Sequence, residues 1–114
     1  MIPRDSWSRY LRLMEERPEA FAQSPSLPII TDTREAEAFT ARTGRQLGVL
    51  YESPYRILLV DLVQGPKGLF AYERLLPAST GAAVVALPLW EGRFILLRQF
   101  RHALRDSQLA FPRG

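Results

Sequence analysis

The sequence predicts an α+β fold in which helices come first and an antiparallel or mixed β-sheet follows. Apolar residues recur at a spacing of three to four between Asp5 and Arg17, which is the period of an amphipathic helix. After Gly48 the pattern changes to β-branched and aliphatic runs separated by glycine turns. A chain of 114 residues is long enough for one domain, or for part of one.

The first helix should begin at Asp5 or Ser6, because either side chain can cap the first turn. Pro18 disfavours helical geometry at Arg17, so the helix should end close to that residue. We expect residues 20–21 to fold back onto this helix. The prolines and serines of residues 23–28 predict a loop of extended chain.

A second helix is predicted from cap candidates at residues 31–33 to a stop at Gly44. The strands begin after it. Residues 49–51 form a short strand, and residues 57–63 form a β-branched run typical of a buried strand. The turn at residues 65–68 should join that run to residues 69–76 as a hairpin.

A further hairpin is predicted between residues 82–87 and 93–100, with Glu91 and Gly92 at its turn. A last short strand should cover residues 108–111. The composition shift at residues 77–79 places a boundary between an N-terminal subdomain, residues 1–78, and the first strands of a second one, residues 79–114. Because the last strand leads straight into Gly114 and would leave an open edge, we expect the natural chain to continue.

Composition excludes several classes of function. With no cysteine there is neither a disulfide framework nor a thiolate metal site. The longest apolar runs, near residues 57–60 and 82–90, are too short to span a bilayer, and the first residues lack the apolar core of a secretory signal. We therefore expect a cytoplasmic protein with no membrane partner.

The charge is mildly basic, at +3, and fourteen of the fifteen cations are arginine. Clustered cations favour nucleic-acid binding because they release counterions from phosphates, but this excess is small. Nucleic acid is therefore not the expected partner. Arginine does supply planar donors suited to bidentate phosphate contacts.

Two apparent catalytic motifs are interpreted as ordinary loops. His102, Asp106 and Ser107 lie close together in sequence, whereas catalytic triads are assembled from distant segments. As the only histidine, His102 would also need carboxylates from elsewhere to hold a metal. The glycines at 65 and 68 lack the length and the following Ser or Thr of a phosphate-binding P-loop, so this segment is a turn.

An arginine group, defined as Arg98, Arg101, Arg105 and Arg113, is the main electrostatic feature, with Asp106 as the only carboxylate nearby in sequence. In a regular strand Arg98 shares a face with Phe100, and Arg101 lies on the other face. A desolvated guanidinium at the end of an apolar strand face suits an anionic ligand, and a solvated strand end is the alternative.

Three segments in succession resemble Nudix hydrolases of the ADP-ribose pyrophosphatase type. They are the valine-rich run after Gly81, the aliphatic run that ends in Arg-Gln-Phe-Arg at residues 98–101, and the Pro-x-Gly of residues 112–114. The resemblance covers about the last third of the chain. It implies the first strands of an incomplete Nudix fold, an α/β/α sandwich.

The resemblance also implies roles for single residues. Arg101 corresponds to an arginine that contacts substrate, Arg74 is similar to a second one, and Arg98 lies in the same signature. The backbone carbonyl of Arg113 corresponds to a metal ligand, and Gly114 to the first residue of the Nudix box. The glutamates of that box, which bind Mg²⁺ and activate water in the family, would follow Gly114.

The expected function is that of a parent enzyme. It would hydrolyse a nucleoside diphosphate derivative such as ADP-ribose with Mg²⁺, whereas this chain alone should be inactive. The N-terminal subdomain is expected to pair subunits into a homodimer. Two alternatives stay open: a dimerisation or regulatory module without enzymatic activity, and nucleic-acid binding through the arginine group.

Overall fold

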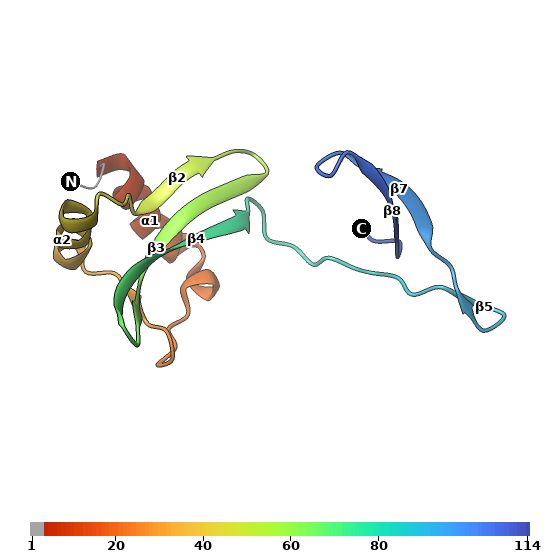
Figure 1. Ribbon diagram of the computed structural model, residues 1–114, viewed down its shortest axis with the longest axis horizontal. Coiled ribbons are helices and arrows are strands. Elements are labelled where there is room, and N and C mark those ends of the chain that lie inside the picture. Colours follow the sequence, from red (N-terminus) through yellow and green to blue (C-terminus); the bar gives the residue numbers. More distant parts are fainter. Residues whose placement is uncertain (1–3) are drawn as a thin grey trace. The chain divides into compact units, whose positions relative to one another are not determined.

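A computed structural model describes residues 4–114 of the chain. These residues form a mixed α+β structure with two α-helices, a short 3₁₀-helix and antiparallel strands, as predicted. The chain divides after Ser79 into two compact units, within one residue of the predicted boundary. Figure 1 shows both units.

Helix α1, Arg4–Glu16, is followed by the 3₁₀-helix η1, Pro18–Phe21. Their buried side chains are Trp7, Tyr10, Leu13 and Phe21. Tyr10 stacks on Trp7 and meets Phe21 edge to face, so the predicted fold-back of residues 20–21 is confirmed. The predicted cap is wrong, because the helix starts before Asp5 and Ser6 uses its hydroxyl to reach Leu47 O at 2.9 Å.

Helix α2, Thr33–Thr43, has the predicted start and stop. The carboxylate of Asp32 accepts a hydrogen bond from the N–H of Glu35 at 3.0 Å, which satisfies one of the free donors of the first turn. Gly44 takes a left-handed conformation, with φ 76°, and donates its N–H to Thr40 O. Neither helix of residues 4–114 is long and apolar enough to cross a membrane.

The first unit contains a four-stranded antiparallel sheet. Its strands are β1 Ile29–Ile30, β2 Gly48–Glu52, β3 Arg56–Gly65 and β4 Gly68–Pro77. Strand β3 is central: β4 pairs with one edge over its full length, and β2 and β1 share the other. The hairpin of β3 and β4 confirms the prediction, whereas the two-residue strand β1 was not predicted.

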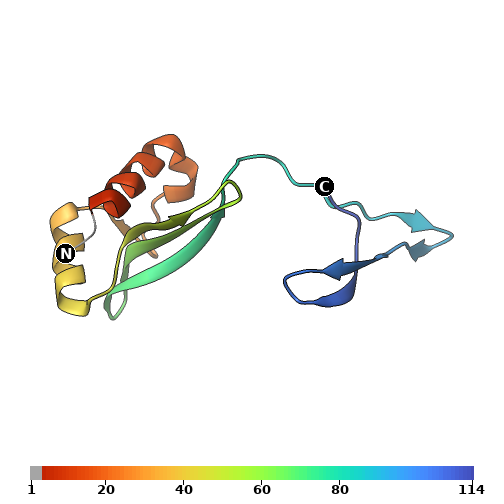
Figure 2. The same cartoon turned by 90° about the horizontal axis from the view of Figure 1, so that it is seen from above.

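The core lies around α1 and β3. Residues of both alternating faces of β3 are buried, which explains its continuous apolar run: Ile57, Leu59, Val60, Leu62 and Val63. Helix α1 lies against the sheet beside β2 (Figure 2). Gly48 allows this close approach, since a Cβ there would lie 2.6 Å from the backbone oxygen of Ser6.

The second unit, residues 80–114, consists of two hairpins. Strand β5, Leu89–Trp90, pairs with β6, Arg93–Phe94, and β7, Leu97–Arg101, pairs with β8, Asp106–Ala110. The predicted turn is confirmed, with positive φ at Glu91 and Gly92. The last strand is also present, two residues earlier at its start than predicted.

Two predictions for this unit were wrong. The strand expected over residues 82–87 is not formed, and that segment joins only a single bridge, from Val85 to Arg113. The strand expected over 93–100 is interrupted at Ile95 and Leu96, because the chain changes pairing partner there from β5 to β8. None of residues 80–114, all of which the structure describes, is buried.

Candidate functional site

The hairpin of β7 and β8 positions the two predicted strand arginines on opposite faces. Arg98 lies opposite Leu109 and shares its face with Phe100, which lies opposite Ser107. We call this the Phe100 face. Arg101 lies on the other face, directly opposite Asp106. The predicted alternation is therefore confirmed, and a carboxylate neighbours Arg101 but not Arg98 in the ladder.

The turn of this hairpin adds a second cation to the Phe100 face. Arg105 has a positive φ of 54° in the turn between β7 and β8, and its guanidinium carbon lies 4.9 Å from the centre of the Phe100 ring. Its Nη1 is 2.8 Å from His102 Nδ1. Stacking on an aromatic ring holds the guanidinium by a cation–π contact while its remaining donors stay accessible.

The two units differ in net charge and in ion pairing. Residues 80–114 contain five arginines and two carboxylates, Glu91 and Asp106, so they account for the whole +3 charge of the chain. All ion pairs found within residues 4–114 lie in the first unit. The arginines of the second unit thus have no carboxylate within 4 Å in the described structure. Such cations are available to an anion from solution.

The segment 112–114 runs antiparallel to residues 84–86. The N–H of Val84 donates to Gly114 O, that of Gly114 returns to Val84 O, and that of Ala86 donates to Pro112 O, at 2.8–3.0 Å. Arg113 therefore occupies a position whose own N–H and C=O point away from Val85. Within the described residues, no hydrogen bond reaches the Arg113 carbonyl.

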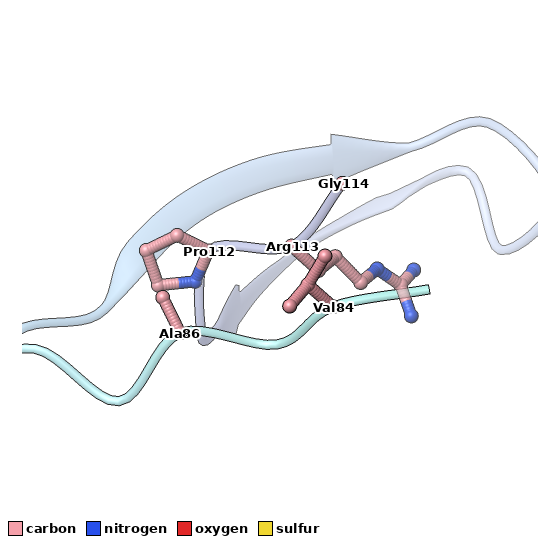
Figure 3. A pocket seen from close by; sticks show the side chains of 5 residues that line it. All are labelled: Val84, Ala86, Pro112, Arg113 and Gly114. Carbon is pink, nitrogen blue, oxygen red and sulfur yellow. The ribbon is translucent and has the colours of Figure 1, made fainter. Parts of the chain in front are cut away.

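A small open pocket of about 220 Å³ is lined by Val84, Ala86, Pro112, Arg113 and Gly114. Figure 3 shows the guanidinium of Arg113 extending away from the Pro112 ring. The lining is mostly apolar. A backbone carbonyl oxygen is one of the ligand types that Mg²⁺ takes from proteins. The role of Arg113 as a metal ligand stays a prediction.

Arg74 has a different environment. Its Nε donates to Asp61 Oδ2 at 2.6 Å, its Nη2 to Asp61 Oδ1 at 3.2 Å, and its Nη1 to Ala20 O at 2.7 Å. The guanidinium also lies 5.0 Å from the centre of the Phe21 ring. All three nitrogens therefore have protein acceptors. In this arrangement Arg74 connects β4 to β3 and η1 and so stabilises the first unit. A substrate role for it stays a prediction.

Sequence reasoning missed two features of these sites. The first is the ion pair of Asp61. An aspartate inside the apolar run of β3 is buried and requires a partner, so its position in the sequence was a signal that could have predicted this ion pair. The second is the contact of Arg105 with Phe100, which depends on the turn joining β7 to β8. The pairing of these two strands was not predicted. Arg98 and Arg105 are the members of the arginine group that the Phe100 face brings together.

Residues 4–114 include no group of three or more His, Asp or Glu side chains arranged to hold a metal ion. What the second unit offers chemically is cationic donors, an aromatic ring and backbone oxygen. Comparisons with protein-family models, with curated proteins and with solved structures found no match to this chain.

Proposed function

We propose that residues 80–114 form the diphosphate-binding part of a Nudix-type hydrolase that acts on a nucleoside diphosphate derivative such as ADP-ribose. One observation supports this most strongly: the arginines of the second unit hold the entire excess charge of the chain and have no ion-pair partner among residues 4–114. Guanidinium groups that have no carboxylate partner are free to pair strongly with phosphate oxygens.

The Phe100 face suits a nucleotide better than a simple anion. Arg98 and Arg105 provide donors for a diphosphate, and the Phe100 ring provides an aromatic surface beside them. Aromatic rings and guanidinium planes both stack with bases, a contact worth about 1–3 kcal/mol per base. Arg101, which the family resemblance favours, lies opposite Asp106 on the other face of the hairpin.

The proposed reaction also requires Mg²⁺ and carboxylates. The Arg113 carbonyl fits one oxygen ligand, because it points away from its strand partner and accepts no hydrogen bond from the described residues. A bound Mg²⁺ would neutralise diphosphate charge and activate water. In the family that this segment resembles, the carboxylates lie beyond the position of Gly114. We therefore assign binding to residues 80–114 and hydrolysis to groups outside residues 1–114.

Titration calorimetry with ADP-ribose at low salt tests the binding step. Arg98→Ala and Arg105→Ala should each weaken binding about tenfold or more, since a hydrogen bond to a charged group contributes about 1.5–3 kcal/mol. Arg93→Ala removes the same charge from the hairpin of β5 and β6 and serves as the matched control. It should change affinity less than either variant.

Equal losses in all three variants would show that only net charge matters, which contradicts a specific site. Adding salt then separates the alternatives. Nucleic-acid binding through many phosphates predicts a steep linear fall of log affinity with log salt, whereas a diphosphate contacting two arginines predicts a shallow one.

A further inference from the structure

The outer edge of β4 is unpaired. Over residues 4–114, β4 pairs with β3 and with no other strand. The two-residue turn between Gly65 and Gly68 sets the alternation of hydrogen bonds along the hairpin. Every second residue of β4 therefore directs its N–H and C=O outward, namely Leu69, Ala71, Glu73 and Leu75.

Two hydrogen bonds beyond the strand agree with this alternation. The N–H of Ala78 donates to Tyr55 O, toward the β3 side, at 3.0 Å. The carbonyl of Pro77, one residue earlier, points the other way and accepts from Arg17 Nη1 at 2.7 Å. Arg17 thus closes the end of the edge, and eight backbone groups between Leu69 and Leu75 are left for a partner.

The side chains of β4 add apolar surface beside these groups. Phe70, Tyr72 and Leu75 are 39%, 52% and 62% exposed. An edge strand with free backbone groups and exposed apolar side chains is a template for pairing with another strand. Which strand can pair with this edge depends on the residues of β4 that would lie opposite it.

We propose that the outer edge of β4 pairs antiparallel with β4 of a second copy of the chain, about a two-fold axis at Tyr72. A two-fold axis perpendicular to a sheet places one residue opposite itself. Centring on Glu73 would set two carboxylates against each other, which is destabilising. Centring on Ala71 would place Leu75 opposite the turn residue Lys67. The outward N–H and C=O of Leu75 would then have no strand partner.

Centring on Tyr72 avoids both problems. Leu69 then faces Leu75 of the second copy, and Ala71 faces Glu73, so all eight outward groups of each strand find partners. Tyr72 meets its own copy as an aromatic pair. No like charges oppose each other in this register, and this self-complementarity identifies a second copy as the partner. The inference is independent of the proposed diphosphate binding.

The register can be tested by cysteine cross-linking, because the chain contains no cysteine. Tyr72→Cys would place two thiols in a non-hydrogen-bonded pair with Cα atoms about 4.5 Å apart, within the span of a disulfide. Leu75→Cys is the control, since its copies would be separated by six residue steps, about 20 Å. Mild oxidation should yield a disulfide dimer at position 72 and none at position 75.

A second test removes the edge without removing β4. Glu73 is exposed and its N–H is not used by β3, so Glu73→Pro should preserve the hairpin while blocking the partner strand. Light scattering should show a dimer for the parent chain and for Glu73→Ala, and a monomer for Glu73→Pro. Circular dichroism should show that the proline variant is folded.

The inference is overturned if the parent chain is monomeric throughout the micromolar range. It is equally overturned if cysteines at 72 and 75 cross-link to the same extent, or if folded Glu73→Pro remains a dimer. Should the proline variant fail to fold, the comparison of the two cysteine variants still decides.

Discussion

Arg74 holds Asp61 by two hydrogen bonds, from Nε to Oδ2 at 2.6 Å and from Nη2 to Oδ1 at 3.2 Å. The carboxylate is buried, and Tyr10 donates a third hydrogen bond to it at 2.6 Å. Since Arg74 also donates to Ala20 O, this network connects α1, η1, β3 and β4. A carboxylate buried in the core is thereby paired and hydrogen-bonded.

Removing Asp61 should therefore be severe. Asp61→Ala leaves the Arg74 guanidinium and the Tyr10 hydroxyl without their acceptor, and breaking a buried pair in this way costs about 3–5 kcal/mol. Urea unfolding followed by circular dichroism measures this loss. Glu73→Ala, an exposed carboxylate on β4, should change stability by no more than about 0.5 kcal/mol. A similar loss in both variants would contradict a special role for Asp61.

The same network predicts sensitivity to alkaline pH. Burial, and then the negative charge of Asp61, raise the pKa of Tyr10 well above its ordinary value of 10.0. Because the pKa is raised in the folded state, the unfolded chain loses this proton first. The contribution of Tyr10 is complete below pH 10.0 and declines as the pH rises toward its folded-state pKa.

Thermal unfolding between neutral pH and pH 11 checks this sign. Tyr10→Phe should start less stable, by about 1–3 kcal/mol for the unsatisfied Asp61, and should then lose less stability above pH 10. Tyr55→Phe removes an exposed phenol and is the control. If Tyr10→Phe and the parent chain showed parallel alkaline profiles, the buried phenol would not be the titrating group.

Gly48 predicts a steric limit where α1 meets β2. Its φ is +100°, and an added Cβ would lie 2.6 Å from the backbone oxygen of Ser6. Gly48→Ala should therefore lose more than the roughly 1–3 kcal/mol expected for backbone strain alone. Gly68→Ala has φ +129° and open space around its Cβ, so it isolates the strain component. Equal losses in urea unfolding would show that α1 can move aside.

Much of the first unit was predictable because its signals are local. The helix cap at Asp32, the stop at Gly44 and the apolar run of β3 each lie within a few residues of the structure they determine. The start of α1 was misplaced because Ser6 uses its hydroxyl on Leu47, 41 residues away, instead of on its own helix. The periodicity of a sequence does not predict side-chain contacts between residues that are far apart in the chain.

The second unit was harder to predict because the choice of strand partner is not local. Residues 93–100 were predicted as one strand, yet the chain leaves β5 and joins β8 within two residues. The prediction that Arg98 and Arg101 lie on opposite faces was still correct, since it depends only on the two-residue period within β7. The ion pair of Arg74 with Asp61 was not predicted, because Asp61 lies on the neighbouring strand and 13 residues away in sequence.

The central claim is that residues 80–114 bind a diphosphate and that hydrolysis requires groups outside residues 1–114. Phosphorus NMR of ADP-ribose with Mg²⁺ and this chain reports both steps in one spectrum. The account predicts that the diphosphate resonances shift or broaden, that Arg98→Ala reduces the effect, and that no monophosphate resonance appears. Conversion to AMP by this chain, or diphosphate resonances unchanged by it, would contradict the account.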